Sequence, residues 1–375
     1  MLAGVGLCVA AATAWSKWQA GDGLVDVTGL SLEQAVKKQF ASTDAPGAVV
    51  GVYGPDGKVV LELALGVADV DTREPLTIDH HMRIASVTKM FVGTAILLLA
   101  DEGLLSLDDP ISKYVDGVPR GDEITLRMLG RHTSGLFNSI ENQAFQRAIM
   151  AAPDYPWSPE EILAYAYEKT PYAAPGERWR YSNSNAILLG MACEKTTGTA
   201  IADVVRDRVL APLGLGSTGF PPADGTLPTP SPSAYRNGYP TKVLGYGDTW
   251  YDVTGYSGSW TGAAGDMYST VRDLGRAAET LATGTLLSES SRAELAAWQP
   301  TPLPGADYSF MLARRDGAVG HTGDVPGFNA FTAYVPEADL SVVVLTNLSN
   351  NADGTMPAEA IAKIVVSKLL ESARE

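Results

Sequence analysis

The sequence predicts a mixed fold, α/β (α+β), with one antiparallel sheet built from both ends of the chain and a mostly helical lobe inserted between them. A hairpin pattern near the N-terminus, three strand patterns near the C-terminus and a helical middle predict it. Neither end has enough strands for a stable sheet alone, because an isolated hairpin is only marginally stable. We therefore expect the two ends to share one sheet that is flanked by the terminal helices.

The first elements are expected to be a helix and a hairpin. Residues 30–40 carry apolar side chains four positions apart, a spacing that is typical of a helix. Two β-rich runs, 47–53 and 58–65, flank the sequence Gly-Pro-Asp-Gly at 54–57. That tetrapeptide favours a turn, so the two runs are predicted to pair as a hairpin.

The middle of the chain is predicted to form helices and loops. Residues 86–103 are apolar on nearly every side, but the apolar stretch is too short to span a bilayer. This pattern predicts a helix buried inside the protein. Residues 158–167 fit another helix, capped by Ser158 with Glu161 three positions later. Residues 220–252 are rich in proline and are expected to be loop.

The tail of the chain returns to strands and ends in a helix at about 357–371. Turn sequences begin at Val325 and at Pro336. The strand patterns that these turns separate are 317–322, 329–335 and 341–346.

These elements divide the chain into an N-terminal segment, 1–24, and one domain of two lobes, 25–375. The sheet lobe is expected over about 25–82 and 262–375, and the helical lobe over about 83–261. We expect a cleft between the lobes.

Composition and charge exclude several classes of protein. Hydrophobic residues make up 45% of the chain and charged residues 19%, so a packed core is expected. The chain has 28 Lys and Arg against 43 Asp and Glu, a net charge of −15, which disfavours a nucleic-acid partner. Four His and two Cys are too few and too scattered for a zinc or disulfide scaffold. We expect no cofactor and no metal, and a small molecule or peptide as substrate.

The N-terminal segment resembles an export signal. Residues 2–15 read LAGVGLCVAAATAW, a run without a charge that is shorter than a membrane-spanning helix. Ala12-Thr13-Ala14 has the small-residue spacing of a cleavage site. We expect export, with membrane association only through this segment; the alternative is an apolar arm. Once Cys8 is removed with the segment, Cys193 has no partner and is expected to be a buried thiol.

Ser86-Val87-Thr88-Lys89 is the first candidate for chemistry. It is the only S-x-x-K in the chain, and it lies where the buried helix is expected to begin. Residues three apart share a helix face, so the Lys89 amine can reach the Ser86 hydroxyl. The helix N-terminus offers unpaired amides to a developing oxyanion, and desolvation favours the neutral lysine that acts as a base. Taken alone, the motif also fits a surface serine and lysine.

Tyr181-Ser182-Asn183 is the second candidate, and an apolar helix is expected to follow it from Ala186. Tyr181 could relay a proton with Lys89, and Asn183 could hold a substrate amide or the lysine itself. The alternative is an aromatic residue that covers the start of a helix.

His321-Thr322-Gly323 is the third candidate, on a predicted strand. Side chains alternate along a strand, so His321 and Gly323 share one face while Thr322 and Asp324 share the other. Glycine at such a position lets a substrate backbone lie alongside the strand. The alternative is a histidine that ends an edge strand.

Together and in this order, the three motifs resemble the active-site triplet of the superfamily of class C β-lactamases, penicillin-binding proteins and D-alanyl-D-alanine carboxypeptidases. The resemblance covers about 30–370, and the stretches 124–136, 175–183 and 259–270 support it. It implies a β-lactamase/transpeptidase-like fold. Tyr in the second motif and His in the third look more like the serine carboxypeptidase and esterase branch than like class C β-lactamases, which carry Lys in the third.

The resemblance also implies roles for the matching residues. Ser86 would be the nucleophile that forms an acyl-enzyme, and Lys89 and Tyr181 would share the duty of general base, with the first base left open. The backbone amides of Ser86 and Asp324 would form the oxyanion hole. His321 is counted with the catalytic set. The residues expected to contact the substrate are Asn183, His321, Thr322, Gly323 and Asp324.

Trp260 is also counted with the residues that contact the substrate, as a wall of the cleft, with packing in the core as the alternative. Two further features lie outside this set. His132 is interpreted as structural. The sequence at 214–219 fits G-x-G-x-x-G, but it follows Ala-Pro and runs into Phe-Pro-Pro, so a dinucleotide site is rejected.

Asp324 departs from the family pattern, because relatives that recognise a terminal carboxylate tend to have a small or hydroxylated residue after the third motif. Its carboxylate is expected beside Thr322, where a substrate carboxylate would dock, and like charges about 4 Å apart repel by on the order of 1–4 kcal/mol. Arg314 or Arg315 could turn inward and compensate, or both lie on the surface. Neutral esters, neutral amides and amine-bearing peptides all stay open as substrates.

The leading functional hypothesis is a serine hydrolase of the D-alanyl-D-alanine carboxypeptidase type, acting on peptide amides through an acyl-enzyme. An esterase or D-amino-acid amidase with the same machinery is the second hypothesis, and a β-lactamase is the third. A penicillin-binding sensor without turnover is the alternative from a different functional class. The oligomeric state stays open.

Overall fold

A computed structural model describes residues 23–237 and 251–374 of the chain. The expected export signal, with Cys8, and part of the proline-rich stretch lie outside the described residues. Within the two described ranges, no helix is both long enough and apolar enough to span a bilayer.

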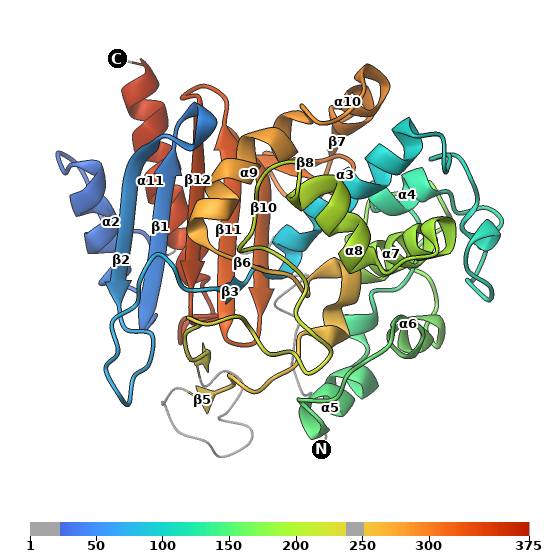
Figure 1. Ribbon diagram of the computed structural model, residues 1–375, viewed down its shortest axis with the longest axis horizontal. Helices are drawn as coiled ribbons and strands as arrows, with labels where there is room; N and C mark the ends of the chain where they lie inside the picture. The colour runs from blue at the N-terminus through green and yellow to red at the C-terminus, as the bar shows by residue number, and fades with distance from the viewer. Residues whose placement is uncertain (1–22, 238–250, 375) are drawn as a thin grey trace.

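An eight-stranded antiparallel sheet forms the centre of the molecule, and both ends of the chain contribute strands to it (Figure 1). N-terminal strand β1 pairs with C-terminal strand β12, with Val50 opposite Val344, which confirms the predicted joint sheet. In spatial order the strands are β2 (Val59–Gly66), β1 (Gly47–Tyr53), β12 (Leu340–Thr346), β11 (Phe328–Val335), β10 (Ala318–Val325), β9 (Ala313–Arg315), β8 (Ala306–Tyr308) and β7 (Gln299–Pro300).

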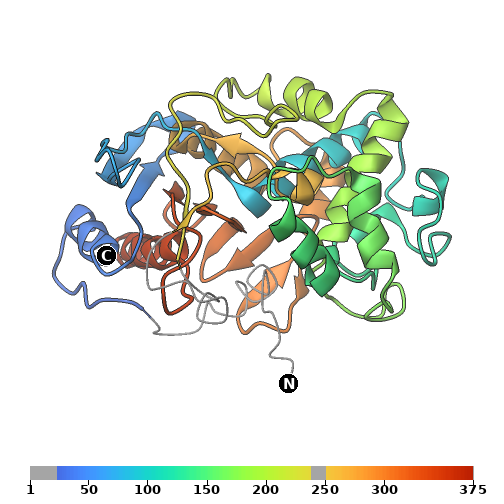
Figure 2. The same ribbon diagram turned by 90° about the horizontal axis from the view of Figure 1, so that it is seen from below.

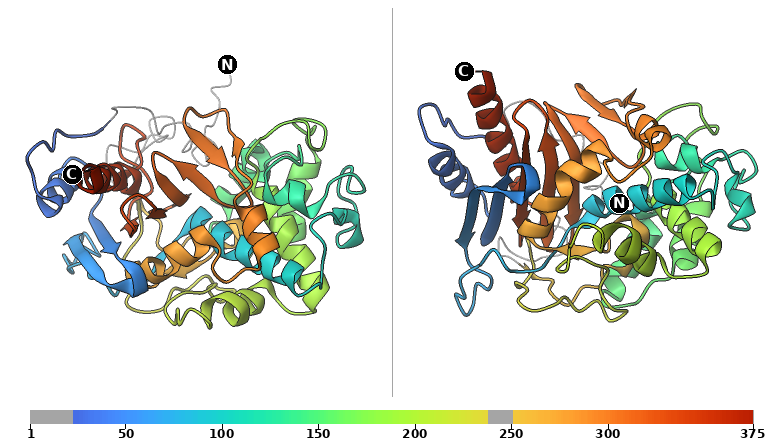
Figure 3. Two further views of the ribbon diagram at one scale, coloured as in Figure 1. Left: turned by 90° about the horizontal axis from the view of Figure 1, so that it is seen from above. Right: turned by 45° about the horizontal axis from the view of Figure 1, so that its top comes forward.

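Helices cover both faces of this sheet (Figures 2 and 3). On one face, α2 (Leu32–Phe40) packs against α11 (Pro357–Arg374), and both contact an apolar layer from β1, β11 and β12. These terminal helices confirm the prediction. The other face carries α9 (Val271–Thr283), a helix that the sequence analysis did not predict. Its buried apolar residues Val271, Leu274, Ala277, Ala278 and Leu281 recur at helical spacing, so the sequence carried a signal for this helix that was missed.

A mostly helical lobe lies beside the sheet (Figure 1). Its α3 (Thr88–Asp101) is buried on nearly every side, as its apolar sequence predicts, and it packs against α7 (Asn183–Thr197). Helix α6 (Pro159–Tyr167) begins with the predicted capping box. Further α-helices are α4 (Leu126–Gly130), α5 (Gln143–Ala151), α8 (Ile201–Val205) and, between α9 and β7, α10 (Glu289–Leu295).

Two short strand pairs connect distant parts of the chain. Strand β3 (Met82–Arg83) pairs with β6 (Tyr268–Ser269) directly before the S-x-x-K motif. Strand β4 (Tyr235–Arg236) pairs with β5 (Tyr251–Asp252), which corrects the prediction of loop throughout 220–252. Backbone pairing of two residues each leaves no hydrophobic periodicity for sequence analysis to detect.

Strand β10 extends beyond its predicted end. It continues to Val325, because the hairpin to β11 turns only at Pro326 and Gly327, where φ is 89°. The third motif and Asp324 therefore lie inside the strand, with their side chains on alternating faces. One face of β10 packs against the short turn that carries Ser86, and the other faces α11.

Candidate active site

Ser86 lies in a tight turn between β3 and α3. Residues Ala85–Val87 form a single 3-10 turn, and α3 begins directly after it at Thr88. Ala85 has a φ of 48°, in the left-handed region, which costs about 1–2 kcal/mol for a residue with a Cβ. Ala85 is buried, so surrounding packing holds this conformation and fixes the position of the serine.

Gly323 lets this turn approach the sheet. A Cβ at position 323 would lie 2.3 Å from the carbonyl oxygen of Ile84 and 3.0 Å from the Cβ of Ala85. The Ile84 segment is also held from behind, since its N–H donates to the carbonyl of Met267. The chain's own turn thus fills the space that was expected for a substrate backbone, which corrects the predicted role of Gly323.

The Lys89 amine is the centre of the site. Its Nζ lies 3.0 Å from Ser86 Oγ, 2.8 Å from Asn183 Oδ1 and 2.6 Å from the carbonyl oxygen of Ala264. Lys89 is fully buried, and burial lowers the pKa of its amine well below 10.5. A neutral amine has two N–H groups and one lone pair. The two carbonyl oxygens accept both N–H groups, so the lone pair is left for the Ser86 hydroxyl.

Tyr181 contacts the Ser86 hydroxyl as well. Its OH donates to Ser86 Oγ at 3.0 Å, and its ring centre lies 5.1 Å from Lys89 Nζ. Burial raises the pKa of the Tyr181 hydroxyl, which keeps it protonated at neutral pH. The sequence left the first base open between Lys89 and Tyr181. The hydrogen bonds and both pKa shifts favour the lysine, because it has the available lone pair.

His132 braces Tyr181 from the side. The two rings are 4.5 Å apart, and His132 Nδ1 accepts from Asn185 Nδ2 at 2.8 Å and from the Ser182 N–H at 3.3 Å. Burial holds the pKa of His132 well below its usual range, so the ring is neutral. This position agrees with the predicted structural role of His132. The sequence did not indicate that the ring would contact Tyr181 of the candidate site.

His321 is held between two partners in the protein interior. Its Nδ1 donates to the carbonyl oxygen of Thr322 at 2.6 Å, which leaves Nε2 to accept from the Tyr308 hydroxyl at 3.1 Å. The side chain is 2% exposed, and burial together with the charge of Lys89 lowers its pKa to about 3. His321 therefore places a neutral ring in the third motif, 6.2 Å from the ring of Tyr181.

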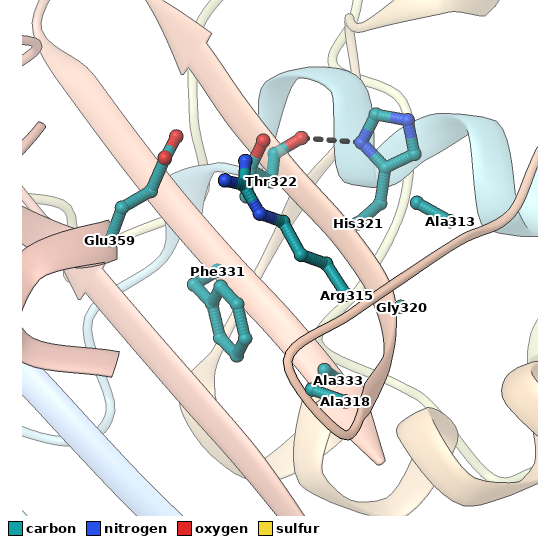
Figure 4. Close-up of a pocket in the computed structure, with 9 residues that line it drawn as sticks. All are labelled: Ala313, Arg315, Ala318, Gly320, His321, Thr322, Phe331, Ala333 and Glu359. Carbon is teal, nitrogen blue, oxygen red and sulfur yellow. Dashed lines mark hydrogen bonds between the residues drawn. The ribbon is translucent and has the colours of Figure 1, made fainter. Parts of the chain in front are cut away.

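Thr322 and Asp324 face away from Ser86, toward α11. Thr322, Arg315 of β9 and Glu359 of α11 line a common pocket (Figure 4). Its volume of about 30 Å³ is room for one water molecule. Burial raises the pKa of Asp324 to about 7 and that of Glu359 to about 8, and the Asp324 charge raises the latter further. The expectation that Asp324 and Thr322 face the docking place of a substrate carboxylate is wrong, because helix α11 packs on that face of the strand.

Arg314 and Arg315, which were expected to compensate the charge of Asp324, point to different places in the structure. Arg315 points inward, but toward Glu359 on the α11 side of the sheet (Figure 4). Arg314 donates to Asp307 and lies over the ring of Trp298. Trp260 is 4% exposed and belongs to the large apolar core, which favours the core alternative over a cleft wall.

The oxyanion hole stays a prediction. The close approach of Gly323 to Ile84 and Ala85 brings together the two segments that carry the backbone amides of Asp324 and Ser86. Within residues 23–237 and 251–374, no three His, Cys, Asp or Glu side chains gather into a group that could hold a metal ion. Cys193 is a buried free thiol in α7.

A family model described as Beta-lactamase matches residues 32–366, which is most of the chain. The chain belongs to the beta-lactamase family. This family member is 25% identical to a penicillin-binding protein of Bacillus subtilis (strain 168) over 347 residues, 84% of this chain and 70% of that protein. It is 27% identical to the esterase EstB of Burkholderia gladioli over 337 residues, 80% of this chain and 85% of that protein.

A solved structure of similar fold is the D-stereospecific amidohydrolase from Streptomyces sp.. It matches with a TM-score of 0.76 and 30% sequence identity, over 88% of this chain and 96% of that chain. The match confirms the β-lactamase/transpeptidase-like fold that the three motifs imply. This member of the beta-lactamase family is a serine hydrolase of the acyl-transfer type.

Proposed function

We propose that this protein is an amidase or esterase that cleaves D-amino-acid amides and neutral esters through an acyl-enzyme on Ser86. The observation that carries the proposal is the state of His321. A terminal carboxylate bound in a dry site needs a cation or several donors opposite it, because burial of an unpaired charge is costly. The ring of His321 is neutral, and its nitrogens are engaged by Tyr308 and by the carbonyl of Thr322.

Two of the arginines near the third motif, Arg314 and Arg315, support the same substrate class. Arg314 is engaged by Asp307 and Trp298, and Arg315 lies on the α11 side of β10 with Glu359. The Thr322 side chain, which could offer a hydroxyl to a carboxylate, also lies on the α11 side. Similarity to a D-stereospecific amidohydrolase and to an esterase favours substrates without a required terminal carboxylate.

The proposed reaction begins with attack of Ser86 Oγ on the substrate carbonyl carbon. Lys89 accepts the Ser86 proton, and the negative charge that forms on the carbonyl oxygen is stabilised by the amides of Ser86 and Asp324. The carbon–nitrogen or carbon–oxygen bond then breaks, and the leaving group takes a proton from Lys89, directly or through the Tyr181 hydroxyl. Water attacks the acyl-enzyme in the second half, with the proton transfers repeated, and releases the acid and free Ser86.

Parallel assays on three substrates test the proposal. We expect turnover of a D-amino-acid amide such as D-phenylalaninamide and of p-nitrophenyl acetate, with little release of D-alanine from a D-Ala-D-Ala tripeptide. Ser86→Ala should abolish all turnover. The carboxypeptidase hypothesis would replace the proposal if the tripeptide were cleaved faster than its C-terminal amide derivative, and nitrocefin turnover would favour a β-lactamase.

A further inference from the structure

We infer that Glu141 is a positioning residue that sets the direction of the Asn183 amide and, through it, the direction of the Lys89 lone pair. Glu141 ends the short turn Ser139–Glu141 and does not touch the Ser86 hydroxyl. Between it and Lys89 lie two side-chain amides, those of Asn138 and Asn183. The inference rests on acyl transfer by Ser86 and Lys89, not on which acyl donor is natural.

The carboxylate of Glu141 can only accept hydrogen bonds. Its Oε1 faces Asn138 Nδ2 at 3.5 Å, and its Oε2 accepts from the Tyr172 hydroxyl at 2.6 Å. Arg180 Nη2 donates to both carboxylate oxygens, at 3.3 and 3.1 Å. The Tyr172 oxygen in turn accepts from the Asn138 backbone N–H at 3.1 Å, so its own hydrogen is directed at Glu141. Glu141 is thus held by donors on three sides.

The Glu141 carboxylate and the backbone N–H of Asn183 together determine which way each amide points. Asn138 must turn its NH2 toward Glu141, and its Oδ1 then accepts from the backbone N–H of Asn183 at 3.1 Å and from Asn183 Nδ2 at 3.4 Å. Because the NH2 of Asn183 is used by Asn138, its Oδ1 is the atom that faces Lys89, at 2.8 Å. Each amide in the series therefore has a single favourable direction.

The direction of the last amide decides what the lysine lone pair does. With Oδ1 toward Lys89, Asn183 and the carbonyl of Ala264 take the two N–H groups of the neutral amine, and the lone pair meets the Ser86 hydroxyl. With the amide reversed, Asn183 Nδ2 would donate to that lone pair and compete with Ser86 for it. A reversed amide would also repel the charged ammonium, since an NH2 donor would face an N–H donor.

Other titratable groups surround Lys89 and Glu141, the two residues at the ends of this series of hydrogen bonds. Lys89 faces the protonated Tyr181 and the neutral rings of His132 and His321, whose pKa values the Lys89 charge helps to lower. Glu141 faces Arg180 and Tyr172. Among these groups, the Glu141 carboxylate is the acceptor that faces Asn138 Nδ2.

The test is Glu141→Gln, with the rate of Ser86 labelling by a fluorophosphonate followed by intact mass spectrometry from pH 4 to 10. Glutamine keeps the shape but can offer Asn138 either an oxygen or an NH2. This removes one of the two contacts that fix the direction of Asn138 and weakens the preference of the Asn183 amide for turning Oδ1 toward Lys89. We expect the plateau rate to fall about tenfold and the acidic midpoint to move to lower pH by about half a unit or more. The label is a general serine-hydrolase reagent, so the result does not depend on the proposed substrates.

A merely structural role for Glu141 predicts the opposite shift. If E141Q only loosened the packing, water would reach Lys89 and the acidic midpoint would move to higher pH, toward the ordinary pKa of lysine at about 10.4. That result, or an unchanged profile, would overturn the inference. Glu168→Gln is the matched control, because Glu168 accepts from the Asn142 side chain at 3.4 Å in the same lobe without a link to Lys89. It should label like wild type.

A rescue variant completes the test. In Asn138→Asp/Glu141→Gln, the new carboxylate at 138 can only accept, so it again requires the NH2 of Asn183 and turns Oδ1 toward Lys89. We expect the plateau rate to recover to within about twofold of wild type. A double variant that labels no faster than E141Q would overturn the inference. Should E141Q fail to fold, as judged by near-UV circular dichroism, the labelling rate of the folded double variant is compared with that of wild type. A rate within about twofold of wild type supports the inference, and a rate about tenfold lower overturns it.

Discussion

The Tyr308 hydroxyl donates to His321 Nε2 at 3.1 Å, and this hydrogen bond sets the character of the third motif. Nδ1 of the same ring donates to the carbonyl of Thr322, so both ring nitrogens have a hydrogen-bond partner while the imidazole is neutral. A family position that holds a lysine in class C β-lactamases thus holds an uncharged group here, which is the basis for proposing neutral substrates.

The buried His321 predicts that acid destabilises the fold. Its pKa is lowered to about 3 in the folded protein, against about 6.5 in the unfolded chain, so the unfolded state binds more protons between those values. Stability from this group is complete above pH 6.5 and falls as the pH drops toward 3. Urea unfolding at pH 7 and pH 4.5 should show a smaller loss for His321→Gln than for wild type. An equal loss in both proteins would contradict the assignment.

Lys89 predicts the pH dependence of acylation. Burial lowers the pKa of its amine well below 10.5, so the reactive neutral form should become dominant at a much lower pH than for an exposed lysine. The labelling rate of Ser86 is expected to rise through a single acidic transition and to be level well before pH 10. Lys89→Met, which keeps the apolar stem, should slow labelling by about a thousandfold. A rate that still climbs with slope one at pH 10 would show that the amine is charged.

Tyr181 should matter for catalysis more than for binding. Its OH donates to Ser86 Oγ at 3.0 Å, and burial raises its pKa, so it acts as a proton donor rather than as a base at neutral pH. Tyr181→Phe is expected to lower kcat about a hundredfold on a D-amino-acid amide with little change in KM. The loss should be smaller on a p-nitrophenyl ester, whose leaving group needs no proton. Equal losses on both substrates would argue against proton donation to the leaving group.

The parts of the site that have a local chemical signature were predictable from the sequence. Ser86 and Lys89 are three positions apart on one helix, and the helical spacing alone brings the amine to the hydroxyl. Tyr181 and His321 required the resemblance to a family, because nothing in their neighbours along the chain places them beside Ser86. The joint sheet was predictable too, since two incomplete sets of strands need each other.

At the site, the errors concern surfaces that meet only in the folded chain. Strand alternation correctly separated Thr322 and Asp324 from His321 and Gly323, but it could not tell which face α11 covers. Glu359, which approaches this face, lies 35 positions beyond Asp324 and belongs to no motif. Asn138 and Glu141 were missed for the same reason, because the direction of an amide depends on partners from separate elements.

Gly323 provides a test of the packing between the sheet and the Ser86 turn. An added Cβ would lie 2.3 Å from the carbonyl oxygen of Ile84, so the turn or the strand must shift. Gly323→Ala should destabilise the fold by about 1–3 kcal/mol and should reduce Ser86 labelling even where the protein is folded. Gly216→Ala is the control for the loss of glycine, since its φ, like that of Gly323, lies outside the positive region and its added Cβ would meet open space. A fully active, wild-type-stable G323A would refute the close approach.

Asp324 and Glu359 predict a second pH dependence, of opposite sign to that of His321. Burial raises the pKa of Asp324 to about 7 and that of Glu359 to about 8, against ordinary values near 4, so the folded protein binds more protons between those limits. Stability should therefore fall as the pH rises from about 5 to 8, when two negative charges form behind β10. Arg236 near Asp324 and Arg315 near Glu359 oppose this loss without removing it, because the pKa values of both carboxyls stay raised in their presence.

Glu359→Gln removes one of these charges and keeps the shape of the side chain. We expect the variant to be more stable than wild type at pH 9, by more than about 1 kcal/mol, and nearly equal at pH 5, where Glu359 is already neutral. Thermal unfolding at the two pH values measures both differences. Glu371→Gln on the exposed end of α11 is the control, with no change expected at either pH. If E359Q lost stability equally at both values, the carboxylate would have to be charged and paired with Arg315 throughout, and the raised pKa would be wrong.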